Sequence, residues 1–352
     1  MSSAPATLLA IAERVESRLT ALLEDEVSRW SALDRDLCAP LLAVQSLVAS
    51  GGKRLRPAFC HWGFVGAGGD PDDQRPIDAG AAFELLHAFA LFHDDVMDGS
   101  ATRRGARTTH LAFADDHEEQ GWTGEPRRFG EGVAILVGDL AFVYADVLLR
   151  DAPSPAIDVW NELRIELNIG QYLDILGTAR GERDRVKAER IARYKSGKYT
   201  VERPLHLGAL LAAPERADVL LPALSAYGLP LGDAFQLRDD VLGAFGDEEI
   251  TGKPVGDDIR EGKPTPLMAI ATANATAVQR AVLARVGAPD LTDDEVATIQ
   301  QVLIATGALS ELELQIDSLA TTALASLDTA PLSDDARKGL DELARYVAWR
   351  EA

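Results

Sequence analysis

The sequence predicts an all-α fold, organised as one large helical domain. The chain has 352 residues, of which 47% are hydrophobic and only 6% aromatic, and this composition suffices for a core of many packed helices. The apolar residues Leu8, Ile11, Val15, Leu19 and Leu22 are spaced by three and four, which is the period of one buried helix stripe. We find no segment with the two-residue alternation of a strand.

Polar stretches rich in Gly and Pro divide the sequence into helices rather than into domains. They lie at 66–76, 114–132, 151–155 and 246–266, and none is long enough for a flexible interdomain linker. The helices expected at 78–98 and 229–242 each carry acidic residues near their C-terminal end. The most apolar stretch, 132–149, contains Asp139 and Asp146, which would each cost roughly 2.5–3.5 kcal/mol at a bilayer centre. We therefore expect a buried helix there, with no transmembrane segment.

The charge balance argues against several classes of partner. With Lys+Arg 35 and Asp+Glu 56, the net charge of −21 opposes nucleic acid and anionic membranes, and it favours a cationic cofactor. Cys38 and Cys60 have neither a disulfide-type nor a metal-type spacing, so we expect a reducing, cytoplasmic location. The early charges at Glu13 and Arg14 are unlike a signal peptide.

Two acidic motifs carry the strongest chemical signal. They are Asp94-Asp95-Val96-Met97-Asp98 and Asp239-Asp240-Val241-Leu242-Gly243. Asp94 and Asp98 share one helix face and repel by roughly 0.2–0.5 kcal/mol, at the helix end where the dipole disfavours acids. Two acidic faces directed at one cavity match the needs of Mg²⁺, which takes hard oxygen ligands and shares them with substrate phosphates.

Basic motifs alternate with the acidic ones along the chain. They are Gly51-Gly52-Lys53-Arg54-Leu55-Arg56-Pro57, Thr102-Arg103-Arg104-Gly105, Lys195-Ser196-Gly197-Lys198 and Thr251-Gly252-Lys253-Pro254. Each alone could be ordinary surface charge. Together with the acidic motifs they indicate phosphate anions held through metal at one end and directly by Lys and Arg at the other.

In their order, these residues resemble the head-to-tail (trans-type) isoprenyl diphosphate synthases, most closely the geranylgeranyl diphosphate synthases. The resemblance covers nearly the whole chain and rests on these segments: 52–57, 84–89 running into 93–98, 103–105, Gly138-Asp139, 170–174, 194–196, 235–240 and 251–253. It implies a single polyprenyl synthetase domain over 1–352, with ten or more helices around a central cavity. It also implies a homodimer.

The resemblance assigns roles to individual residues. Asp94 and Asp98 would bind two Mg²⁺ and Asp239 a third, all bridging an allylic diphosphate. The residues expected to contact that diphosphate are Arg103, Lys195 and Lys253, with Ser196 and Gln236 beside them. Those expected to hold the diphosphate of isopentenyl diphosphate without metal are Lys53, Arg56, His87 and Arg104. His87 could equally be a core histidine.

The sequence departs from the family pattern at three places. Gly243 stands where the second motif often has aspartate, so Asp239 would do most of the metal binding there. Ser196 replaces the usual threonine and keeps the hydroxyl. The stretch 115–131 is longer and more charged than the usual connection.

The implied reaction is a Mg²⁺-dependent prenyl transfer in isoprenoid biosynthesis. Ionisation of the allylic diphosphate leaves a cation that the double bond of isopentenyl diphosphate attacks, and the departing diphosphate is the expected base. Alternatives are a farnesyl or longer-chain synthase, a class I terpene cyclase with one diphosphate site, and a non-catalytic synthase subunit. The cluster of Lys53, Arg56 and Arg104 argues against the cyclase.

Product length depends on the helix before Asp94. At about 1.5 Å per residue, Phe89 and Ala90 lie roughly 6–8 Å below Asp94 and Leu86 roughly 12 Å below, so these residues would line the path of the growing chain. In the family, an aromatic residue five positions before the motif with a small one at four resembles a geranylgeranyl stop. Phe89 and Ala90 fit that pattern. Phe89 could instead be a core residue.

Overall fold

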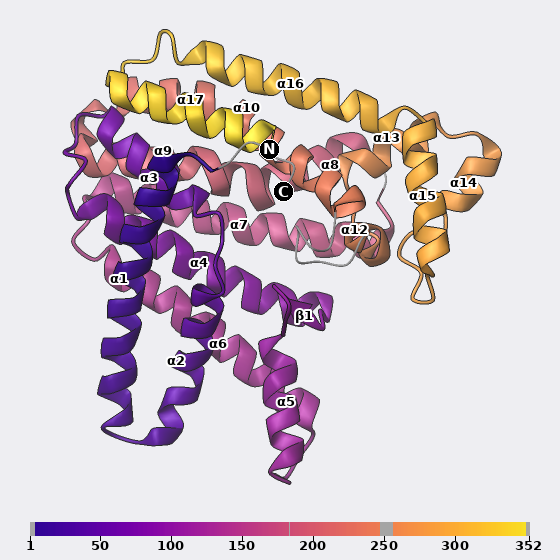
Figure 1. Ribbon diagram of the computed structural model, residues 1–352, viewed down its shortest axis with the longest axis horizontal. Helices are drawn as coiled ribbons and strands as arrows, with labels where there is room; N and C mark the ends of the chain where they lie inside the picture. The colour runs from indigo at the N-terminus through magenta and orange to yellow at the C-terminus, as the bar shows by residue number, and fades with distance from the viewer. Residues whose placement is uncertain (1–3, 183, 247–255, 350–352) are drawn as a thin grey trace. The chain divides into compact units, whose positions relative to one another are not determined.

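The computed structural model describes residues 4–182, 184–246 and 256–349 (Figure 1). These residues are predominantly helical, and their only strands are β1 (Thr102–Arg103) and β2 (Ala106–Arg107), which pair antiparallel. The predicted all-α class and the ten or more helices are therefore confirmed. By its internal contacts the chain divides into two compact units.

The first unit consists of Ala6–His61 and Asp70–Pro153. Its elements are α1 (Ala6–Ser31), the 3₁₀ turn η1 (Arg35–Leu37), α2 (Cys38–Ala49), the start of α3 (Leu55–Gly66), α4 (Arg75–Asp98), the two strands, α5 (Thr109–Glu119) and α6 (Pro126–Leu148). Helix α4 contacts α1, α2, α5 and α6. It is therefore the central element of this unit.

The sequence of α4 explains its central position. Pro76 lies in its first turn, where a missing N–H costs nothing, and the residues from Ala79 to Leu86 are buried on every side. The helix ends where Gly99 adopts a left-handed φ of 66°. Burial decreases toward this end, so Asp94 and Asp98 emerge from the core while the rest of the helix is held inside it.

Helix α1 buries the predicted stripe with one difference. Leu8, Ile11, Val15 and Leu19 are buried as expected, but the fifth member is Leu23 rather than Leu22. The fifth buried residue therefore lies four positions after Leu19. Helix α1 packs on both α2 and α4, and its buried face lies against both of them.

Two sequence predictions about 114–149 were wrong in part. The stretch 114–132 was expected to be an interruption, yet α5 continues to Glu119 and α6 begins at Pro126, because α5 buries His110, Ala114 and His117 at helical spacing. The apolar stretch 132–149 does form a helix, but one face of it is exposed rather than buried. The exposed residues are Ile135, Leu136, Val143 and Val147.

The second unit consists of Met1–Pro5, Trp62–Gly69 and Ser154–Ala352, where described. Its elements are the rest of α3, α7 (Ser154–Arg180), α8 (Arg185–Ala192), the π-helical η2 (Arg193–Glu202), α9 (Arg203–Ala212), η3 (Pro214–Arg216), α10 (Ala217–Phe245), α12 (Asp257–Glu261), α13 (Pro266–Asn274), α14 (Ala277–Leu283), α15 (Asp293–Ala305), α16 (Ala308–Ser326) and α17 (Asp334–Ala348). Helix α10 contacts η2, α9, α12, α13, α16 and α17. Figure 1 shows α16 and α17 in yellow, side by side.

A close approach of backbones places η2 against α7. A methyl group on Gly170 of α7 would lie 2.8 Å from the Cα of Lys195, so only glycine permits this contact. Single π-helical segments occur often at functional sites, and here η2 carries the predicted Lys195 and Ser196. In the part of the chain that the structure describes, no helix combines the length and hydropathy of a membrane span.

Candidate functional site

The first acidic motif divides its carboxylates between two environments. Asp94 is half-buried and Asp98 exposed at the end of α4, whereas Asp95 is buried. Burial raises the pKa of Asp95, and the hydrogen bond from Arg103 opposes this rise. Asp95 is therefore committed to a protein contact, whereas Asp94 and Asp98 lie nearer to solvent.

Arg103, on strand β1, connects the two-stranded hairpin to this motif. Its guanidinium donates to Asp95 Oδ1 at 2.9 Å from Nε and at 2.5 Å from Nη2, and Nη2 lies 4.0 Å from Asp94 Oδ2. The side chain is thus held beside the predicted metal ligand. A diphosphate bound at Asp94 would meet this guanidinium directly.

The two strands meet in a tight turn that separates Arg103 from Arg104. Arg104 has a φ of 52° and Gly105 a φ of 75°, the left-handed pair expected for a two-residue hairpin turn. Non-glycine residues in this region are uncommon and concentrate at functional sites.

Arg104 contacts the loop after α2. Its guanidinium donates to the Gly51 carbonyl and, at 3.1 Å, to Ser50 Oγ. It also donates to the Leu47 carbonyl in the last turn of α2, at 3.4 Å. Arg104 is thus tied to the glycine loop that precedes Lys53.

Arg54 holds the other side of this loop and is structural. It is buried, it also has a positive φ, of 49°, and it donates to Glu84 at 2.5 Å and to the Val48 carbonyl at 2.7 Å. A methyl group on Gly52 would lie 3.3 Å from the guanidinium groups of both Arg54 and Arg104. The two arginines thus fix the loop from which exposed Lys53 extends.

Positive charge surrounds His87. Burial is the main cause that holds the pKa of His87 well below its ordinary value, and the nearby Arg56, Arg104 and Arg103 lower it further. The imidazole is therefore neutral at physiological pH. An anion that binds at these arginines would relieve their mutual repulsion without a metal ion.

The second acidic motif has negative rather than positive charges around it. Asp239 is half-buried and Asp240 is buried at 4% exposure. Gln236 Nε2 donates to Asp240 Oδ1 at 2.9 Å, while Oδ2 has no hydrogen-bond partner among the described residues. Burial raises the pKa of Asp240 well above its ordinary value, and so do the carboxylates of Asp258, Asp239 and Asp174.

Lys195 belongs to the same surroundings. Its Nζ lies 2.5 Å from Asp174 Oδ2, so η2 and α7 form an ion pair next to the acidic motif. Ser196 is half-buried beside it. Lys253, the remaining cation predicted here, lies outside the described residues.

The carboxylates fit a divalent cation that is shared with substrate. Among the described residues, no three His, Cys, Asp or Glu side chains are grouped closely enough to hold an ion by themselves. Mg²⁺ does not need such a group, because it uses one or two carboxylates together with waters and substrate phosphates. The buried oxygen Oδ2 of Asp240, which has no hydrogen-bond partner among the described residues, is consistent with such an ion.

The predicted chain-length residues lie on α4 at different depths. Leu86 is fully buried, while Phe89 and Ala90 are half-buried. The ring of Phe89 packs against His93 and Phe142, with centroids 4.6 and 4.8 Å apart. Their role in product length stays a prediction.

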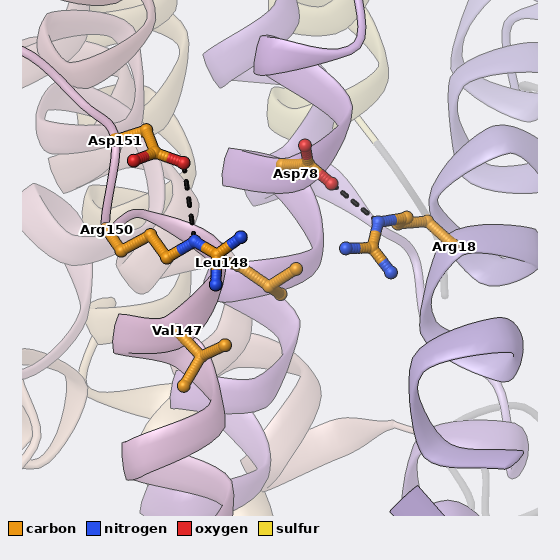
Figure 2. Close-up of a pocket in the computed structure, with 6 residues that line it drawn as sticks. All are labelled: Arg18, Asp78, Val147, Leu148, Arg150 and Asp151. Atoms are coloured by element: carbon orange, nitrogen blue, oxygen red, sulfur yellow. Dashed lines mark hydrogen bonds and ion pairs between the residues drawn. The ribbon is translucent and has the colours of Figure 1, made fainter. Parts of the chain in front are cut away.

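A surface pocket in the first unit lies away from these motifs (Figure 2). It has a volume of about 280 Å³ and is lined by Arg18, Asp78, Val147, Leu148, Arg150 and Asp151. Both of its arginines already pair with carboxylates, Arg18 with Asp78 at 2.6 Å and Arg150 with Asp151 at 3.3 Å. Asp78 is roughly 24 Å from Asp94 along α4, so this pocket is not part of the candidate site.

Comparison with known proteins decides the family. The model of the family described as polyprenyl synthetase matches residues 41–303. The chain belongs to this family. It is similar to the geranylgeranyl pyrophosphate synthase of Corynebacterium glutamicum, solved with isoprenyl diphosphate and magnesium, with 38% identity, a TM-score of 0.89 and coverage of 97% of this chain and 99% of that one.

Curated relatives in the family differ in product. The geranylfarnesyl diphosphate synthase of Aeropyrum pernix is 30% identical over 86% of this chain and 92% of its own. The geranylgeranyl diphosphate synthase of Mycobacterium tuberculosis is 32% identical over 86% of this chain and 81% of its own. These relatives and the family match identify the chain as a prenyltransferase, and they confirm the resemblance stated from the sequence.

Sequence reasoning missed two parts of the site. Asp174 is the partner of Lys195, and Asp258 acts on Asp240 from α12. Asp174 had a signal, since it ends the segment 170–174 that already carried the resemblance. The sequence signal for Asp258 was weaker. Asp258 belongs to the pair Asp257-Asp258, which follows the second acidic motif, and that motif lacks its last carboxylate at Gly243.

Proposed function

We propose that this chain condenses isopentenyl diphosphate with an allylic diphosphate in a Mg²⁺-dependent reaction, with geranylgeranyl diphosphate as the main product. The observation that carries the proposal lies within the first unit. Arg103 contacts the acidic motif at Asp95 and also acts electrostatically on His87, among Arg56 and Arg104. The acidic motif that we propose to bind metal and the cationic cluster that we propose to hold a diphosphate without metal are thus adjacent, which supports two diphosphate sites.

The chain's own residues would divide the work between the two diphosphates. Asp94, Asp98 and Asp239 would hold Mg²⁺, which supplies Lewis-acid stabilisation of the leaving diphosphate when bound. Arg103 and Lys195 would meet the charge that develops as the allylic carbon–oxygen bond breaks.

The second diphosphate would be held without metal. Lys53, Arg56 and Arg104 would bind the isopentenyl diphosphate, while neutral His87 can donate a hydrogen bond to it. The double bond of isopentenyl diphosphate then attacks the allylic cation, and the departing diphosphate accepts the proton. No protein nucleophile is needed.

The remaining sequence predictions form part of this proposal. A single functional domain over 1–352 is supported by a family match that includes residues of both units. A homodimer is supported by the exposed apolar face of α6, which includes Leu136 and Val143. Three Mg²⁺ per site, the action of both acidic motifs on one diphosphate, and a cytoplasmic location stay predictions from the sequence.

The test is incubation with isopentenyl diphosphate and an allylic primer, with Mg²⁺ or with excess chelator. We expect prenyl transfer only with metal, and mainly a twenty-carbon product after dephosphorylation and chromatography. Full turnover in chelator would refute the metal dependence. Consumption of the allylic substrate alone would favour the cyclase, and no turnover under any condition would favour the non-catalytic subunit. A mainly fifteen- or twenty-five-carbon product would correct the length alone.

A further inference from the structure

Gly243 leaves a space on α10 that another residue fills. A methyl group at this position would lie 2.6 Å from Cγ of Asp258 and closer still to its Oδ2. No side chain can therefore stand at 243 while Asp258 keeps its place. The φ of Gly243 is not positive, so its backbone conformation does not require glycine.

The position of that carboxylate relative to Asp239 is fixed by helix geometry. Residues four apart on a helix are neighbours on one face, so the space above Gly243 lies one turn from Asp239 on the same face of α10. Asp258 places its carboxylate at the point where a side chain of residue 243 would begin.

The core holds α12 in this position. Ile259, next to Asp258, is buried in the same apolar cluster as Val241 and Ala244 of α10. A cation lies near Asp258. Lys263 Nζ is 3.7 Å from Asp258 Oδ1, and it also pairs with Glu261.

A second observation indicates that this acidic group needs a cation. Asp240 is buried, and its Oδ2 has no hydrogen-bond partner among the described residues. A buried carboxylate oxygen without a partner is unfavourable while it is charged, and a cation bound there would satisfy it.

We propose that Asp258 supplies the carboxylate missing from the second acidic motif, reaching from α12 into the space above Gly243 to hold Mg²⁺ together with Asp239. The inference rests on the proposed function, because it concerns the metal that Asp239 would bind. The motif is then complete in space although it is broken in sequence. Glycine at 243 is required because it admits Asp258.

The test measures metal binding and not only turnover. Mn²⁺ binding to the full chain is followed by calorimetry with inorganic pyrophosphate present, for the wild type, Asp258→Asn and Asp257→Asn. We expect Asp258→Asn to weaken Mn²⁺ binding about 10–100-fold, the range for losing a supporting ligand, while its neighbour Asp257→Asn binds as the wild type does. Circular dichroism checks that each variant is folded.

A transplanted carboxylate tests position rather than residue identity. The double variant Gly243→Asp/Asp258→Gly should recover most of the Mn²⁺ affinity that Asp258→Gly alone loses. If Asp258→Asn binds Mn²⁺ like the wild type while Asp239→Asn does not, the inference is wrong and the proposed function stands. If the wild type binds no Mn²⁺ with pyrophosphate, the proposed metal function fails first, and the inference with it.

Discussion

Arg103 holds the buried carboxylate of Asp95 with two hydrogen bonds to a single oxygen, Oδ1. The neighbouring Asp94 points in a different direction from the helix, since successive residues differ by about 100°, and its Oδ2 lies 4.0 Å from Arg103 Nη2. One of the two adjacent aspartates thus orients an arginine, and the other is the one that we propose as a metal ligand. Substitution of Asp94 and substitution of Asp95 should therefore have different effects.

Asp94→Ala and Asp239→Ala should each lower turnover by at least about 10²-fold, the scale of losing one preorganised electrostatic contact. Both variants should remain folded by circular dichroism. Asp95→Asn should be milder and should act mainly on the Michaelis constant for the allylic substrate, since it loosens Arg103. Steady-state kinetics with each substrate varied would separate the two effects. A metal-binding defect in Asp95→Asn equal to that of Asp94→Ala would contradict this division.

The two diphosphates should respond to different cations. Lys53→Ala or Arg56→Ala should mainly raise the Michaelis constant for isopentenyl diphosphate, because these side chains belong to the metal-free cluster. Lys195→Ala should mainly affect the allylic substrate, because Lys195 lies beside the second acidic motif through Asp174. Lys253→Ala is expected to resemble Lys195→Ala. The reverse pattern in kinetics would show that the assignment of the two sites is wrong.

Buried histidines predict a loss of stability in mild acid. Burial lowers the pKa of His61 to about 4 and that of His206 to about 3, whereas both would titrate near 6.5 in the unfolded chain. Below pH 6.5 the unfolded state therefore binds more protons than the folded one, and the free energy of unfolding falls as the pH falls toward 4. Melting temperatures at pH 7.5 and 5.0 should differ less in His61→Gln than in the wild type. An unchanged difference would exclude His61 as a source.

The fold class was predictable because apolar spacing and acidic helix ends are local properties of the sequence. Four of the five residues of the α1 stripe and the end of α4 follow from helix period and Gly99. The start of α10 at Ala217 was missed, because the helix continues through Pro222 and Pro230. The exposed face of α6 was not predictable, because an apolar helix has the same sequence whether it is covered by its own chain or not. The helical part of 114–132 was missed because it is rich in charged residues, although Ala114 and His117 are buried.

The candidate site could be predicted from the sequence where its residues stand together in one motif. Asp94, Arg103, Lys195 and Asp239 could be proposed in advance. Asp174, which pairs with Lys195, and Asp258, which lies beside Gly243, could not, since they come from other helices. Arg54 shows the converse. It lies in the most basic motif, yet it is buried against Glu84, and only packing distinguishes such a structural cation from a substrate ligand.

Product length should depend on Phe89 and Ala90, which lie roughly 6–8 Å from Asp94 along α4. Ala90→Phe adds an aromatic ring one position nearer to the metal motif, so the product distribution should shift toward fifteen carbons. Phe89→Ser removes a ring and should lengthen the products. It also removes the packing on His93 and Phe142 and should lower the melting temperature, so Phe89→Leu, which keeps more of this contact, is the matched control. Chromatography of the dephosphorylated products measures both shifts. Unchanged lengths in folded Ala90→Phe and Phe89→Ser would mean that Phe89 is a core residue and that the stop lies elsewhere.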